Sequence, residues 1–249
     1  MMWLWEGEPA PAHRLERILP DGSVAIIVNL YEDRIPIYDR RDVGRFENTS
    51  GTLLVGAQSQ FDIIDAVQPA VASVKFRPGG AWPFFKPPVG EVRDQQIALE
   101  DLWRGARLRE RMLEAPPQTR LQVLEQVLLE RIARPMESHP AVRFALRAFE
   151  KTHAIAAVTE KIGMSSRRFA DVFRNEVGMT PKAFCRVRRF HQAIRRIHDA
   201  QDVDWADVAL SCGYYDQPHF IHDFRAFAGI NPTAYLASRT AHASHIVMR

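Results

Sequence analysis

Cysteine is scarce in this 249-residue chain, which holds only Cys185 and Cys212. Two cysteines cannot build a disulfide framework or a four-ligand zinc site. Both lie in segments with helical periodicity, so we expect buried, reduced thiols in a cytoplasmic protein. No stretch approaches 18 uncharged apolar residues, so we expect no membrane-spanning helix. Residues 1–13 lack a basic region followed by an apolar run, so we expect no secretory signal there.

Histidine is nearly absent from the first 137 residues, where His13 is the only one and cysteine does not occur. A metal-dependent enzyme built on a small β-barrel needs clustered histidine and carboxylate ligands. The same region shows no nucleophile elbow and no phosphate-binding loop, because Gly79-Gly80 has the sequence of a turn. We therefore expect no catalytic residues, no cofactor and no bound metal.

Charge of either sign is balanced over the whole chain, with a net charge of only +3, but the two parts differ. Residues 1–140 hold 17 basic and 20 acidic side chains, whereas residues 141–249 hold 16 and 10. An acidic part followed by a basic part indicates a polyanion-binding module fused to another domain.

Residues from about 14 to 98 favour short strands separated by turns. A β-branched run at 24–30 follows the turn signal Asp21-Gly22, and the runs 52–55 and 70–76 are bounded by glycine or proline. Short strands of this kind indicate a small barrel or sandwich.

Over residues 99–114 and 119–134 the apolar residues are spaced as on one face of a helix. One face of the second helix carries a stripe of aliphatic side chains, namely Leu121, Leu124, Leu128 and Ile132. This stripe packs either in a helical hairpin that closes the domain, which we favour, or against a second copy of the chain. Residues 135–140 begin and end with proline and are interpreted as a linker.

The last hundred residues contain one pattern twice. Each copy has a short apolar helix, a turn at Gly163 or Gly213, and a helix with two phenylalanines. Five pairs of positions keep a constant offset of 51, namely Phe169/Phe220, Phe173/Phe224, Arg174/Arg225, Gly178/Gly229 and Pro181/Pro232. A glycine turn between two short helices indicates a helix-turn-helix, so the chain is expected to carry two such units.

Two helix-turn-helix units on one chain suit double-stranded DNA. The major groove is about 12 Å wide and admits one helix, whose N-terminal residues contact base edges. We call the second helix of each unit its reading helix. The phenylalanines of each reading helix are expected to be buried, which leaves the opposite side for DNA. A long helix over residues 181–199 would hold the two units so that they enter successive major grooves, about 34 Å apart.

The span of residues 141–239 resembles the DNA-binding domain of the AraC/XylS family of bacterial transcription regulators. The resemblance rests on Gly163-Met164-Ser165, on the run from Phe173 to Pro181, and on the run from Gly213 through Phe224-Arg225 to Pro232. The region from Leu19 to Trp103 is similar to an N-terminal domain of poorly defined function that is often fused to it. Pro218 departs from the family, which often has serine or alanine there, but proline is tolerated near a helix start.

The resemblance also implies which residues contact DNA. The expected base-reading residues are Arg167, Ala170 and Asp171 in the first reading helix and Gln217, His219 and His222 in the second. The expected phosphate contacts are Ser165, Arg168, Arg174, Lys182, Arg186 and Arg225. Arg174 and Arg225 suit a salt bridge equally well. The arginines at 188, 189, 195 and 196 are interpreted as ordinary helix surface.

We therefore predict an α+β chain that regulates transcription by sequence-specific DNA binding. Residues 1–134 would form a small β-barrel or sandwich with a helical hairpin, 135–140 a linker, 141–239 an all-α double helix-turn-helix domain, and 240–249 a tail. The first domain would be a sensor or dimerisation domain. Its aromatic residues Trp82, Phe84 and Phe85 would line an effector pocket or, as we favour, fill the core.

Several partners besides DNA stay open at this point, namely RNA polymerase, a small-molecule effector and a second copy of the chain. The alternative function is a cupin-like small-molecule enzyme fused to a DNA-binding module.

Overall fold

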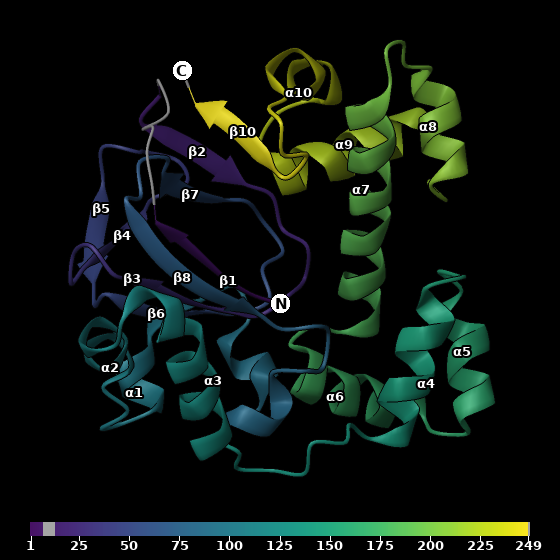
Figure 1. Ribbon diagram of the computed structural model, residues 1–249. Coiled ribbons are helices and arrows are strands. Elements are labelled where there is room, and N and C mark those ends of the chain that lie inside the picture. Colours follow the sequence, from purple (N-terminus) through teal and green to yellow (C-terminus); the bar gives the residue numbers. More distant parts are fainter. Residues whose placement is uncertain (7–12, 249) are drawn as a thin grey trace.

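The computed structural model describes residues 1–6 and 13–248, and it divides into a β-rich part and a helical part (Figure 1). The strands and short helices of the first 130 residues lie on one side of the molecule, and the helices that follow residue 139 lie on the other. The chain then returns to the β-rich part with its last strand. The predicted α+β class is confirmed.

The largest sheet has five antiparallel strands in the order β1, β8, β3, β6 and β9. Their bounds are Met2–Glu6 (β1), Ala70–Lys75 (β8), Ala25–Asn29 (β3), Thr52–Val55 (β6) and Gln96–Ala98 (β9). The runs predicted at 24–30, 52–55 and 70–76 are the three central strands. Residues 71–74 of β8 are all buried, so both faces of this strand are covered.

Two smaller sheets complete the β-rich part. One has the order β10, β2 and β7, with bounds His245–Met248, Leu15–Ile18 and Asp62–Asp65. The other pairs β4 (Ile35–Tyr38) with β5 (Phe46–Thr49). The prediction of a tail over residues 240–249 is wrong for residues 245–248, which pair with β2 along four residues. The free edge of β2 needs hydrogen-bonding partners, and Ile246 of β10 is buried at the same seam.

Glu16 of β2 contacts two histidines, one just before β2 and one at the start of β10. Its carboxylate lies 2.5 Å from His13 Nε2 and 2.7 Å from His245 Nδ1. Burial raises the pKa of Glu16, but the hydrogen bonds to His245 and His13 outweigh it, so the pKa lies below its ordinary value of 4.5. A carboxylate with a lowered pKa in the folded state adds stability above its unfolded pKa, and that contribution is lost as the pH falls through the folded value.

We therefore expect acidification below pH 4.5 to loosen the seam between β2 and β10. The melting temperature of the wild type should fall more steeply over this range than that of Glu16→Gln, which has no carboxylate to protonate. Parallel curves for the two proteins would show that Glu16 contributes nothing to the pH dependence.

Short helices border the main sheet. They are the 3-10 helices η1 (Trp82–Phe84), η2 (Val89–Val92) and η3 (Pro117–Thr119) and the α-helices α1 (Leu99–Leu102), α2 (Leu108–Glu114) and α3 (Arg120–Glu130). The helix predicted over 99–114 is interrupted at 103–107, where Arg107 has a φ of +46°. Leu124 and Leu128 of α3 are buried, so the predicted stripe packs within its own domain. Ile132 lies beyond the end of the helix and is exposed.

The helical part has seven described helices. They are α4 (Pro140–Phe149), α5 (Ile155–Ile162), α6 (Ser166–Val177), α7 (Pro181–Asp199), α8 (Trp205–Ser211), α9 (Gln217–Ala228) and α10 (Pro232–Ser238). Helices α5 and α6 form the first unit, and α8 and α9 form the second. Ser165 caps α6 and Asp216 caps α9, and each accepts a backbone N–H three residues on. None of the described helices combines the length and apolar character needed to cross a membrane.

Candidate DNA interface

The reading helix of the first unit, α6, has a buried side and an exposed side. Phe169 and Phe173 are buried, whereas Arg167, Asp171 and Arg174 are exposed. The three exposed residues follow one another at spacings of four and three, so they lie on one face of the helix. Arg174 Nη2 is 3.4 Å from Asp171 Oδ1. The exposed face of α6 therefore carries one carboxylate between two guanidinium groups.

Three further predicted contacts lie near the start of α6. The Ser165 hydroxyl accepts the N–H of Arg168 at 3.3 Å, and the side chain of Arg168 is exposed. Ala170 is half-buried, because it lies between the exposed face and the buried phenylalanines. A contact of Arg167, Ala170 or Asp171 with a base stays a prediction.

The reading helix of the second unit, α9, repeats the exposed face of α6. At the constant offset of 51, the counterparts of Arg167, Asp171 and Arg174 are Pro218, His222 and Arg225, and all three are exposed. Sequence reasoning missed Pro218, although the same offset would have found it. His222 is the one predicted base-reading residue of the second unit that lies in this exposed stripe.

The other two predicted residues of α9 are less available. Gln217 is half-buried at the helix start. His219 Nδ1 accepts the backbone N–H of Tyr215 at 3.4 Å, and its ring packs edge-on against Tyr214 at 5.3 Å between centroids. These contacts hold His219 against its own protein, whereas His222 is exposed.

A buried carboxylate on α9, Asp223, links the second unit to α7. Only 2% of Asp223 is exposed. Its Oδ1 accepts Arg186 Nη2 at 2.6 Å, and its Oδ2 lies 3.6 Å from Arg189 Nη2 and 3.8 Å from His219 Nε2. Arg189 also donates to the carbonyl of Gly213 at 3.2 Å. Sequence reasoning missed Asp223, although its helical angle between Phe220 and Phe227 places it on the buried side.

These contacts divide the predicted phosphate-binding residues. Lys182 and Arg225 are exposed and have side chains available to a polyanion. Arg186 forms an ion pair with Asp223, so its side chain already has a partner within the protein. Among the arginines interpreted as ordinary surface, Arg196 pairs with Asp207 at 2.5 Å. Arg189 is instead a bracing residue, because it holds both Asp223 and the turn at Gly213.

The three aromatic residues proposed for an effector pocket make packing contacts. Phe85 is buried and stacks on Trp103 with ring centroids 5.1 Å apart, and Phe84 lies 5.4 Å from Phe76. The guanidinium of Arg134 lies 3.6 Å from the centroid of the Trp82 ring. Their geometry is that of core and turn packing, which is the interpretation the sequence favoured.

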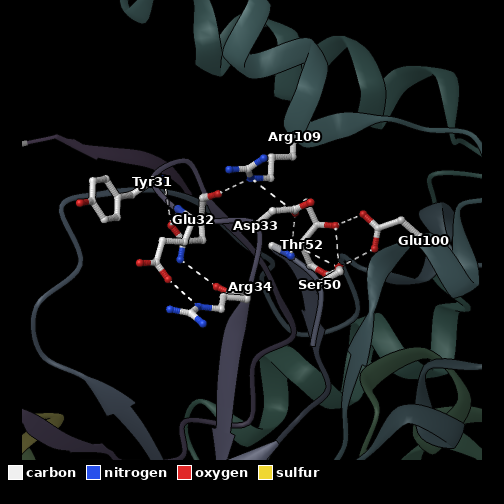
Figure 2. Close-up of polar contacts among 10 residues, drawn as sticks. Tyr31, Glu32, Asp33, Arg34, Ser50, Thr52, Glu100 and Arg109 are labelled. Carbon is white, nitrogen blue, oxygen red and sulfur yellow. Dashed lines mark hydrogen bonds and ion pairs between the residues drawn. The ribbon is translucent and has the colours of Figure 1, made fainter. Parts of the chain in front are cut away.

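A group of polar side chains in the β-rich part joins its strands to its helices (Figure 2). Arg109 Nε donates to the carbonyl of Asn29 at 2.7 Å, which ties α2 to the end of β3. Glu100 of α1 accepts hydrogen bonds from Ser50, at 2.7 Å, and from Thr52. These polar atoms satisfy one another, so the group holds the fold. Within the described residues, no three or more of His, Cys, Asp and Glu are grouped so that they could hold a metal ion.

Both cysteines are buried, but only Cys185 lies within a helix, α7, because α8 ends at Ser211 and Cys212 begins the turn that follows it. Burial raises the pKa of the Cys185 thiol to about 11 and also raises that of Cys212. Because the thiolate is the reactive form, neither thiol is suited to nucleophilic chemistry near neutral pH.

Comparison with known proteins gives two family matches. The family described as "Helix-turn-helix domain" matches residues 158–238, and "Domain of unknown function (DUF6597)" matches residues 1–98. No curated protein matches the sequence significantly.

Solved structures of ToxT from Vibrio cholerae are similar over nearly the whole chain. ToxT in its P21 crystal form has a TM-score of 0.49 and 7% identity, covering 95% of this chain and 97% of that one. ToxT from strain O395 has a TM-score of 0.48 and 8% identity, with 97% of each chain covered. ToxT from strain SCE256 with an unsaturated fatty acid bound has a TM-score of 0.45 and 9% identity, covering 97% and 95%.

The family match and the geometry concern the same residues. Residues 158–238 contain both reading helices, both turns and the long helix α7 between the units. The C-terminal region of this chain is therefore a helix-turn-helix domain of the AraC type.

Proposed function

We propose that this protein is a cytoplasmic transcription regulator that recognises a specific DNA sequence with its two helix-turn-helix units. The observation that carries the proposal is the repeated exposed stripe on α6 and α9. Arg167, Asp171 and Arg174 on the first helix match Pro218, His222 and Arg225 on the second. A repeated stripe opposite a buried phenylalanine face is what a helix needs to lie in a major groove.

The long helix α7 supports binding in successive grooves. Its 19 residues span about 28 Å at 1.5 Å per residue. Helix α6 packs near the start of α7, where Phe173 contacts Phe184, and α9 packs farther along it, where Phe224 contacts Phe190 (Figure 1). One continuous helix therefore contacts both units, as we expect if they bind successive major grooves, about 34 Å apart on one face of B-form DNA.

The residues of the exposed stripes have distinct proposed roles. Arg167 would donate two hydrogen bonds to guanine, Asp171 would accept one from cytosine, and His222 would contact a base in the second groove. Arg174, Arg225 and Lys182 would bind phosphates and so fix the register of the protein on the duplex. Charge attraction to phosphate makes binding by the last three strongly dependent on salt.

We further propose that the N-terminal domain modulates DNA binding through its contacts with the helical part. A cavity of about 170 Å³ lies where the two parts meet, and its lining includes Ser59, Arg93, Arg186 and Phe227. The first two belong to the N-terminal domain, and the others belong to α7 and α9. A small effector in this cavity would touch both domains, and Arg186 would link it to the second reading helix through Asp223.

Replacing Arg167 by alanine tests the proposed function. The operator is first selected from random DNA by the full-length wild type. Arg167→Ala should weaken binding to that operator by about 1–3 kcal/mol and relax the preference at a single base pair, because one bidentate contact is lost. Competition binding against operators substituted at each position measures both effects.

The matched control is Arg45→Ala, which removes an exposed arginine between β4 and β5. This variant should bind every operator like the wild type. Equal weakening of Arg167→Ala on all DNA sequences would make Arg167 a phosphate contact. A wild type without preference for any sequence would refute the proposed function.

A further inference from the structure

Both reading helices end on a glycine that packs against the N-terminal domain. Gly178 ends α6 with a φ of +91°, and Gly229 ends α9 with a φ of +69°. A Cβ added to Gly178 would lie 3.0 Å from Ala57 Cβ, and one added to Gly229 would lie 2.5 Å from Phe61 Cε1. At Gly163, which also has a positive φ, a Cβ would meet nothing within 4 Å. Close approach to the N-terminal domain therefore distinguishes Gly178 and Gly229.

The end of α9 receives hydrogen bonds from the N-terminal domain. The N–H of Phe61 donates to the carbonyl of Phe227 at 3.0 Å, and Arg17 Nη1 donates to that of Ala228 at 3.2 Å. The last carbonyls of a helix have no partner within the helix and carry a partial negative charge. A backbone donor and a guanidinium satisfy them here. Arg17 also lies 4.7 Å from the centroid of the Phe61 ring, which fixes both side chains.

The end of α6 is approached as closely. A Cβ added to Gly90 of η2 would lie 2.8 Å from the carbonyl oxygen of Arg174 and 2.7 Å from its Cγ. Val89 of η2 also lies close to Gly178, because a Cβ added to Gly178 would lie 3.2 Å from Val89 Cγ1. Helix α6 is therefore held by η2 and by Ala57 together.

The segment of residues 57–61, which we call the strut, reaches from one reading helix to the other. Its first residue contacts Gly178 and its last contacts Gly229, and four residues span at most about 14 Å. The strut is itself fixed, because Gln58 Nε2 donates to the carbonyl of Gln95 at 3.1 Å. In addition, Arg40 Nε donates to the carbonyl of Phe61 at 2.5 Å. It is thus a short, braced connection between the ends of α6 and α9.

We propose that the strut sets the separation and relative orientation of the two reading helices, and thereby the half-site spacing that the protein accepts. Helix α7 alone connects the units from one side, whereas the strut connects them from a second side. Two connections fix the angle between the reading helices, whereas a single connection leaves that angle free to vary. Phe61 and Ala57 are accordingly positioning residues for DNA recognition, and they act without touching DNA. The proposal rests on the proposed function, since it requires a DNA site with two halves.

The experiment measures DNA binding against half-site spacing for the full-length protein. The probes are the selected operator and versions with one, two or three base pairs inserted between its halves. Each insertion moves and rotates the second half-site. The wild type should lose about tenfold or more in affinity with the first insertion, as when one or two base contacts are lost. Phe61→Ala should bind the parent operator more weakly, but the four probes should differ by less than about threefold.

Two further variants keep the test decisive. Gly229→Ala introduces a Cβ into the space of the Phe61 ring and should also flatten the dependence on spacing. Gly105→Ala, between α1 and α2, imposes a similar backbone strain at a φ of +69°, where a Cβ would meet nothing within 4 Å, and should keep the dependence of the wild type. Circular dichroism and hydrogen exchange establish that each variant is folded.

The outcomes separate the two proposals. Folded Phe61→Ala and Gly229→Ala proteins that discriminate spacing like the wild type would overturn the role of the strut and leave the proposed function standing. A wild type that discriminates neither sequence nor spacing would overturn both. A flattened dependence in Gly105→Ala as well would also overturn the role of the strut, because backbone strain alone would then explain the effect.

Discussion

Replacing Phe224 by alanine is expected to destabilise the second helix-turn-helix unit by about 3–5 kcal/mol, as for other fully buried phenylalanines. Its side chain is fully buried, and its ring lies 5.3 Å from Phe190, 5.6 Å from Phe220 and 5.7 Å from Tyr235. These neighbours come from α7, α9 and α10, so the substitution opens a cavity where three helices meet. Hydrogen exchange in peptides from residues 205–238 reports the local loss directly.

The control for Phe224→Ala is Leu210→Ala on α8. Leu210 is 64% exposed, so its removal leaves the core intact and should change exchange in the same peptides very little. Peptides from the first unit should keep their protection in both variants. Wild-type protection of residues 205–238 in Phe224→Ala would contradict the assignment of this ring to the centre of the unit.

Replacing Asp223 by alanine is expected to destabilise the attachment of α9 to α7 by about 2–3 kcal/mol, below the range for a fully buried ion pair. The expected loss of stability lies below that range because the side chain of Arg186 is 39% exposed, so solvent screens part of its attraction to Asp223. The variant leaves Arg186 and Arg189 without their shared carboxylate. Thermal unfolding followed by circular dichroism measures the loss, and operator binding should weaken with it.

Two comparisons show whether the charge of Asp223 matters. Asp171→Ala removes the carboxylate of an exposed Asp–Arg pair on α6 and should cost less than about 0.5 kcal/mol of stability. Asp223→Asn keeps the shape and one hydrogen-bond acceptor, so its stability should lie between those of Asp223→Ala and the wild type. Equal small losses for Asp171→Ala and Asp223→Ala would argue against a structural role of the buried cluster.

Local sequence signals account for much of the fold. β-branched runs bounded by glycine and proline gave the three central strands, because such residues suit a pleated, half-buried surface. Ser165 and Asp216, whose side chains are of the kind that caps helices, directly precede the two reading helices. The constant offset of 51 related the buried phenylalanines of the two units, and the same offset applied to Arg167, Asp171 and Arg174 would also have found the second exposed stripe.

Features that depend on contacts between distant parts of the chain could not be predicted from the sequence. Strand β10 forms because the edge of β2 lies nearby in space, and its run of four residues is too short to predict a partner. The role of Asp223 depends on Arg186 and Arg189, which come from another helix. The contacts of Phe61 and Arg17 with the end of α9 join residues more than 160 positions apart in the chain. Each is decided by tertiary packing and not by local propensity.

The most direct test of the central claim is an interference experiment on DNA that the full-length protein selects from a random pool. Methylation of guanine N7 and replacement of thymine by uracil alter only the major groove. Two clusters of interfering positions about 10.5 base pairs apart, on one face of the duplex, are the result expected from two reading helices. A single cluster, or two clusters on opposite faces, would contradict simultaneous binding of α6 and α9.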